Sequence, residues 1–159
     1  MNTHEGIDRI LREHKHWLVS AKQEGKRADL SGAQLDGIDL QGIDLSAAVF
    51  RGASLKSANF TGTRLVHADF SDASLIDANF SKSNLLLTNF TGADLRKANF
   101  SGADSASDSE LGDNHRGPRF KDADLQEANL SQIYCFISDF SGANLSKAKL
   151  TNAMLERAN

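Results

Sequence analysis

The chain has 159 residues, a formal net charge of -3 at pH 7 and a single cysteine, Cys135. This length suits one domain with its own core, the cysteine count excludes an internal disulfide, and the charge lacks the basic excess that direct nucleic-acid binding usually needs. No apolar run approaches the ~20 residues of a membrane-spanning helix and no basic start leads into an apolar segment, so we expect a cytoplasmic protein without membrane contact.

Residues 1–27 predict an amphipathic helix. One face at helical spacing holds Ile7, Ile10, Leu11, His14, Trp17 or Leu18, and Ala21. Thr3 is placed to cap the start of this helix, and Gly25 follows where the helix should end.

A five-residue repeat begins at Ala28. Every fifth residue from Leu30 to Phe100 is Leu or Phe, the residue two places earlier is small or compact and usually alanine, and the residue between them is most often Asp or Asn. The unit reads A-[DN]-[LF]-x-x. A period of five fits neither the 3.6 of a helix nor the 2 of a strand, so the chain must turn at every unit and wind into a solenoid.

The phenylalanines indicate the number of sides of each coil. They alternate with leucines and define the expected core columns, which hold Phe50, Phe60, Phe70, Phe80, Phe90 and Phe100, then Phe120 and Phe140. With four sides, Phe50, Phe70 and Phe90 stack in one column and the other early rings stack opposite. Two sides also satisfy the period but flatten the coil and crowd the rings.

The repeated unit resembles that of the pentapeptide-repeat proteins, over residues 28–159 apart from one interruption. The resemblance implies an all-β solenoid, the right-handed quadrilateral parallel β-helix of that family, here with an N-terminal α-helical cap. One domain then comprises a capping helix at 1–27, repeats at 28–105, an extruded loop at 106–117 and further repeats at 118–159.

The two ends of the solenoid differ in the sequence. Exposed rungs at an open end favour a cap, so we expect the helix to cover the first rung through Trp17 or Leu18. No such element follows Leu145, Leu150 and Leu155. Either two molecules meet there as a homodimer, as in some members of the family, or the chain is truncated.

The interruption lies between Ala106 and His115, where Glu110 and His115 fall at core positions. If these ten residues span two sides of a coil, Phe120 lies under Phe100; if they loop out, Phe120 joins the column of Phe90. Burying Glu110 and His115 unpaired would cost several kcal/mol, which favours a loop. Candidate binding residues of this loop are Ser109, Glu110, Asp113, His115 and Arg116.

Apolar residues at outward positions form a second candidate surface for a partner. Most units carry polar residues or glycine there, whereas the exceptions are Val66, Ile76, Leu86, Leu87, Phe136 and Ile137. If the interruption loops out, Phe136 joins the column of Val66 and Leu86. A continuous apolar patch of this kind often marks a protein-binding surface.

No catalytic, cofactor-binding or metal-binding set is indicated. The repeated Asp is explained by the repeat, which needs a short polar residue to bond nearby backbone at a corner. The helix histidines do not share one face, and no thiol or carboxylate completes a metal site with them.

The sequence therefore favours a non-enzymatic scaffold or protein-binding module whose protein partner is unknown. The alternative is a mimic of duplex DNA, because quinolone-resistance members of the family resemble DNA in width and acidity and occupy the DNA-binding saddle of gyrase. Residues 28–159 carry twelve bases and seventeen acids, a net charge of -5. That excess is weak for a mimic of a polyanion.

Overall fold

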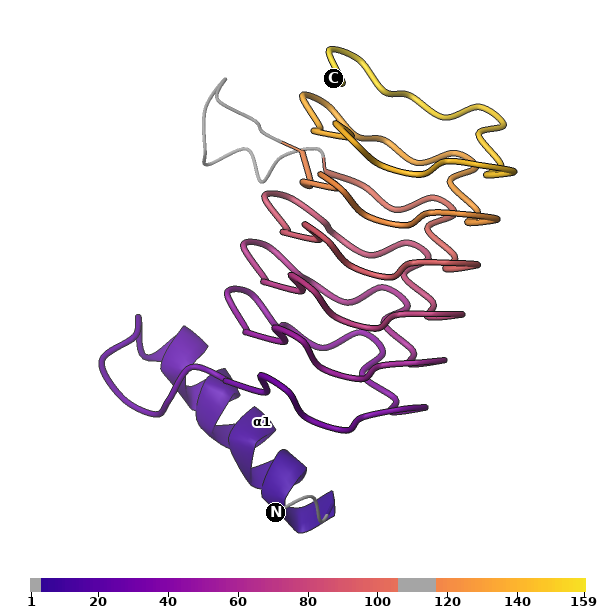
Figure 1. Ribbon diagram of the computed structural model, residues 1–159. Helices are drawn as coiled ribbons and strands as arrows, with labels where there is room; N and C mark the ends of the chain where they lie inside the picture. Colours follow the sequence, from indigo (N-terminus) through magenta and orange to yellow (C-terminus); the bar gives the residue numbers. More distant parts are fainter. Residues whose placement is uncertain (1–3, 106–116) are drawn as a thin grey trace.

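The computed structural model describes residues 4–105 and 117–159, so the expected helix cap Thr3 lies outside the described residues. The chain begins with helix α1, His4–Val19, and then winds into a stack of flat coils (Figure 1). Among the described residues, no helix combines the length and apolar character needed to cross a membrane.

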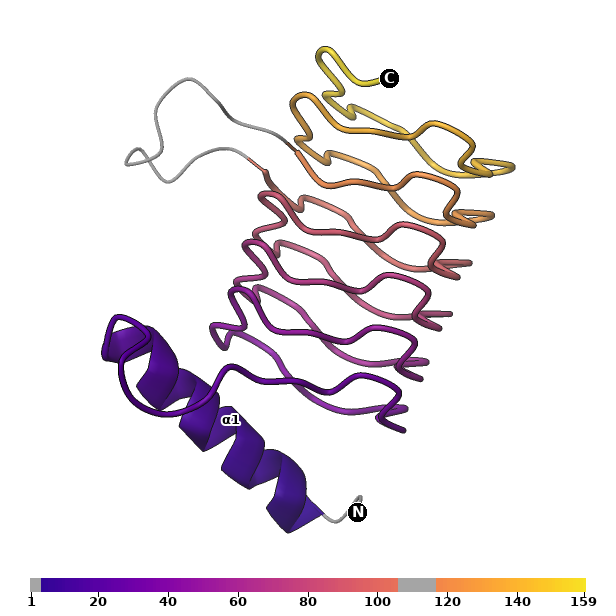
Figure 2. The same cartoon turned by 60° about the vertical axis from the view of Figure 1, so that its left-hand side comes forward.

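Each coil has four sides, because residues twenty apart pair in parallel. Each side contributes one bridging residue rather than an extended strand; Asp29 pairs with Val49, and Val49 with Asp69. Twenty residues are four pentapeptides, which gives four sides. The column of bridges continues through six stacked coils in the described residues, as Asp29, Val49, Asp69, Asn89, Arg119 and Asp139 (Figures 1 and 2).

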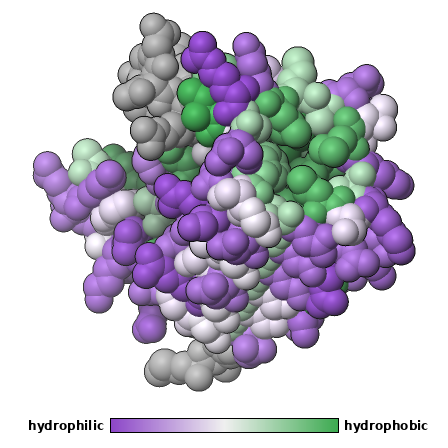
Figure 3. Space-filling view, turned by 45° about the horizontal axis from the view of Figure 1, so that its top comes forward, coloured by the Kyte–Doolittle hydropathy of each residue, from purple (hydrophilic) through white to green (hydrophobic). Residues whose placement is uncertain are grey.

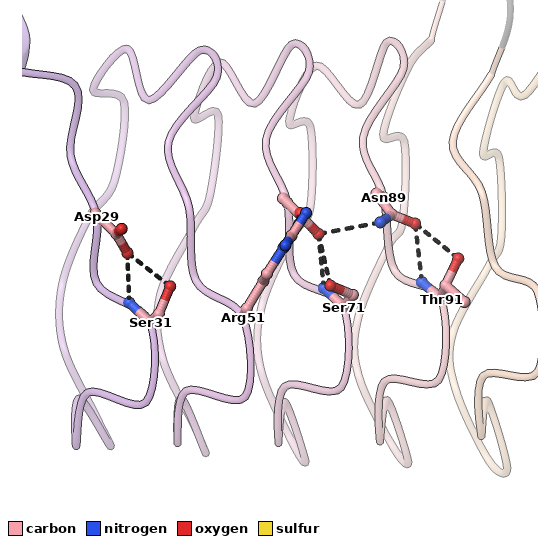
Figure 4. A network of polar contacts seen from close by, with 7 residues as sticks. Asp29, Ser31, Arg51, Ser71, Asn89 and Thr91 are labelled. Atoms are coloured by element: carbon pink, nitrogen blue, oxygen red, sulfur yellow. Dashed lines mark hydrogen bonds and ion pairs between the residues drawn. The ribbon is translucent and has the colours of Figure 1, made fainter.

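The corners explain why the repeat tolerates so much variation outside its core. The second residue after each core position usually has a left-handed backbone, which glycine adopts at Gly52 with φ of 61°. Lys82 and Ile137 occupy the same conformation without being glycine. The Asp or Asn before the core residue supports the turn, as Asp29 does by accepting the Ser31 N–H at 3.1 Å (Figure 4).

The core contains leucines, alanines and two facing columns of stacked phenylalanine rings. Phe50 and Phe70 lie 4.7 Å apart between ring centroids in one column, and Phe60 and Phe80 lie 4.8 Å apart in the other. Rings of opposite columns meet edge to face, as Phe50 and Phe60 do at 86°. The rings from Phe50 to Phe120 are fully buried, and Phe140 packs on Phe120 while partly exposed.

The coil keeps its register across the interruption. Asn89 pairs with Arg119, thirty residues away instead of twenty, and the Phe90 and Phe120 rings stack at 5.2 Å. The chain leaves the coil after Ser105 and is again in register at Gly117. This is the second of the two predicted geometries, with Phe120 in the Phe90 column.

Helix α1 lies across the open end of the first coil (Figures 1 and 2). Its contact with the core is made by Ile7, Ile10 and Leu11, not mainly by Trp17 or Leu18 as the sequence predicted. The three aliphatic residues form one stripe at helical spacing, and the Trp17 ring stacks instead on His14 with centroids 5.6 Å apart.

Candidate protein-binding surfaces

Only some of the apolar residues predicted at outward positions are exposed on the surface. Val66 and Leu86 are 6% and 1% exposed, so the prediction that they face a partner is wrong. Rungs of parallel coils are separated by ~4.8 Å, and outward side chains in one column therefore cover one another. Val66 and Leu86 are vertical neighbours of this kind, twenty residues apart, and both are shielded from water.

Three other residues of this apolar set lie at the corner where the coil resumes, whereas Ile76 lies on another side near Arg96. Leu87, Phe136 and Ile137 are half-buried, and Gly117 stands in the column between Leu87 and Ile137. A groove of 390 Å³ opens there, with Arg157 also at its edge. Any side chain at position 117 would meet the Phe136 carbonyl oxygen, so glycine is required at the floor of this groove.

Two bulky residues of this groove have a left-handed backbone. Leu87 has φ of 57° and Ile137, which is β-branched, has φ of 51°, in a conformation that bulky and β-branched residues rarely adopt. The Arg157 guanidinium lies over the Phe136 ring, 5.6 Å from its centroid. The predicted loop residues Ser109, Glu110, Asp113, His115 and Arg116 border this region in sequence but lie outside the described residues.

Of the large apolar side chains that are exposed in the described residues, two lie in the C-terminal coil and the third, Val19, lies on α1. Leu150 is 43% exposed and Met154 is 56% exposed, and partly buried apolar residues surround them: Phe140, Ala143, Leu145, Ala148, Ala153 and Leu155. The space-filling view shows apolar residues gathered at this end (Figure 3). The sequence analysis named Leu150 at this end but missed Met154. Met154 could have been noticed because it occupies the position before a core residue, where most repeats have Asp or Asn.

The sides of the rod are polar and satisfy their own hydrogen bonds. Along one side the Asn99 amide donates to Asn79 at 3.2 Å, and Asn129 donates to Asn99 at 3.1 Å. On another side Asp69 accepts from Asn89 and pairs with Arg51 (Figure 4). These ladders engage Asn and Asp side chains on two sides of the described coils.

Several acidic groups on the sides are neutralised by adjacent bases. The Arg96 guanidinium donates to Asp94 at 2.7 Å, and this bond holds the pKa of Asp94 below its ordinary value. Arg96 also lies 3.8 Å from Asp124, and Lys147 lies 3.7 Å from Glu127. Each of these acidic groups therefore lies beside a base, and no continuous anionic track forms from them.

The buried polar residues of the coil serve the fold. Ser105 takes a core position and donates its hydroxyl to the Tyr134 carbonyl oxygen at 3.1 Å. Burial raises the pKa of Cys135 to about 12, so its thiol is protonated and unreactive at neutral pH. Among residues 4–105 and 117–159, no three His, Cys, Asp or Glu side chains are grouped to hold a metal ion.

The model of the pentapeptide repeats matches residues 28–65, 68–104 and 138–159, with eight copies. The chain belongs to the pentapeptide-repeat family. No curated protein matches its sequence.

Several solved structures are similar to this chain. Rfr23, a pentapeptide repeat protein from the cyanobacterium Cyanothece 51142, is 16% identical over 92% of this chain and 99% of its own, with a TM-score of 0.37. A trypsin-treated variant of QnrB1, a plasmid-mediated fluoroquinolone resistance protein, is 16% identical over 84% of this chain and 86% of its own, with a TM-score of 0.47. A pentapeptide repeat protein of the Arabidopsis thaliana thylakoid lumen is 27% identical over 68% of each chain, with a TM-score of 0.38.

Proposed function

We propose that the protein is a non-enzymatic binding scaffold, and that the apolar face of its C-terminal coil is the docking surface. The exposure of Leu150 and Met154 carries this proposal. Exposed apolar patches with polar rims are typical of protein-binding surfaces.

The backbone of this coil supports a second copy of the chain as the occupant. In the coil below, the Leu130 N–H donates upward to the Lys149 carbonyl at 2.8 Å. The equivalent N–H of Leu150 has no coil above it in the described residues. A second C-terminal coil offers both an apolar face and backbone acceptors, and a twofold arrangement would cover both faces at once.

The test is the mass of the protein in solution, measured by analytical ultracentrifugation over a range of concentrations. We expect a dimer for the wild type and a monomer for the double variant Leu150→Asp, Met154→Asp. Val19→Asp is the matched control, since Val19 is 73% exposed on α1 at the opposite end and its variant should remain a dimer. A wild type that stays monomeric throughout excludes the second copy as the occupant.

The corner groove is a second candidate contact within the same proposal. Leu87 and Ile137 line it and are half-buried, and Gly117, where the described coil resumes, lies between them. A pull-down comparing the wild type, Leu87→Asp and a deletion of residues 106–115 tests this surface. Recovery of the same proteins by all three excludes it.

The alternative function, mimicry of DNA toward gyrase, is disfavoured by the charges on the rod. A DNA mimic needs anionic groups that face a basic partner, whereas Asp69 and Asp94 here pair with Arg51 and Arg96. A gyrase supercoiling assay with a quinolone distinguishes the two proposals. Salt-sensitive protection of the enzyme would support the mimic, and an unchanged response to the drug would remove it.

A further inference from the structure

His14 joins the helical cap to the first coil. Its side chain is 1% exposed, and its Nδ1 accepts the backbone N–H of Ala28, the first residue of the repeats, at 3.1 Å. This side-chain hydrogen bond joins α1 to the first coil. Because Nδ1 accepts, the neutral ring carries its proton on Nε2.

The other ring nitrogen has no compensating partner. Nε2 is buried and makes no hydrogen bond with the described residues. The charged groups that act on the ring oppose one another: Asp44 of the first coil favours a positive ring, and Arg27 of the connecting segment disfavours it. Asp44 also lies 3.7 Å from the Arg64 guanidinium, which reduces its support for a charged His14. On α1 itself, the neighbours Glu13 and Lys15 are exposed to water.

Protonation of His14 would therefore weaken the contact between α1 and the first coil in two ways. A second proton on the ring occupies Nδ1, so the Ala28 N–H loses its acceptor. The same proton places a charge in a buried contact with no partner for Nε2–H. Both effects cost free energy only while α1 is docked, because the ring is hydrated once the helix leaves.

We propose that His14 makes the cap an acid-sensitive latch, which holds α1 on the first coil at neutral pH and releases it on acidification. Release would expose the leucines of the first rung, Leu30, Leu35, Leu40 and Leu45, while the coil itself stays folded. The rod would then present an apolar face at each end instead of one.

The direction of the pH dependence follows from the burial of the ring. Burial lowers the pKa of His14 in the docked state, whereas the free helix has an ordinary value near ~6.5. The docked state therefore binds fewer protons. Attachment is at full strength above ~6.5 and weakens as the pH falls through that value, by about tenfold for each pH unit until the docked ring also takes up a proton.

Hydrogen exchange of backbone amides, corrected for the intrinsic effect of pH, tests the latch on the full chain. Between pH 7.5 and pH 5, chosen as roughly one unit or more on either side of the free value, we expect the protection of α1 amides to fall about tenfold or more. Protection of the amides around Phe80 should not change over the same range. Equal protection of α1 at both values overturns the proposal.

Two variants separate His14 from other titrating groups. His14→Gln has a neutral amide at every pH, so its α1 protection should be independent of pH, whatever its level. His16→Gln is the matched control, because His16 is exposed on the same helix beside Glu24 at 3.1 Å, and it should respond as the wild type does. A pH response that persists in His14→Gln, or disappears in His16→Gln, contradicts the latch.

Discussion

The two ends of the rod are built from the same column of residues and differ in what covers them. Leu40 in the first coil and Leu150 in the last coil hold equivalent positions on one side, yet Leu40 is 1% exposed and Leu150 is 43% exposed. Helix α1 accounts for the difference, because it lies over the first coil (Figure 2). The repeat therefore sets the position of a core side chain, and only the neighbouring layer decides whether that side chain is buried.

A substitution in the interior of the rod gives the stability cost with which substitutions at both ends can be compared. Phe80 is fully buried between Phe60 and Phe100, with coils above and below. We expect Phe80→Ala to lower the free energy of unfolding by about 3–5 kcal/mol, because the lost ring leaves a cavity that stacked coils cannot close. Chemical denaturation measures this cost, and an unchanged midpoint would contradict the ring columns.

The capped end should behave almost like the interior. Leu40→Ala is expected to cost about 2–4 kcal/mol by the same measurement, because the helix seals the first coil. The matched variant Leu130→Ala, on the same side and fully buried within the rod, should cost a similar amount. A much smaller cost for Leu40 than for Leu130 would mean that α1 does not cover the coil in solution.

The C-terminal end should show the smallest effect. For the monomer, Leu150→Ala is expected to cost less than about 1 kcal/mol, since much of its side chain is already in water. The cost should rise with protein concentration if a second copy covers this face. A cost that is large and independent of concentration would show that another part of the chain buries Leu150.

The sequence predicted the parts of the fold that depend on repetition. The alternation of Phe50 and Phe60 with leucines indicated two ring columns, and the charge on Glu110 and His115 indicated that the interruption leaves the coil. Both follow from local rules of burial. The handedness of the coil, implied by the family resemblance, stays a prediction.

The features that the sequence could not predict depend on contacts between coils or with the cap. His14 was placed on the inner face of the helix, but its bond to Ala28 requires the angle at which α1 crosses the coil. Val66 and Leu86 were placed outside correctly by register, and their burial arises from their packing in one column. Met154 reaches the surface because of its place in the last coil.

The register at the interruption has a consequence for how such a rod can diversify. Ser105 donates its N–H to Tyr134 at 2.8 Å and Gly117 donates to Phe136 at 2.7 Å, as two residues of one ordinary pentapeptide do. In sequence, eleven residues (106–116) thus separate two positions between which other coils have a single residue. A sequence inserted between Ser105 and Gly117 can change in length and composition, because every later coil still begins at the same position. The coil can therefore acquire or lose a binding segment there without any compensating change in its core.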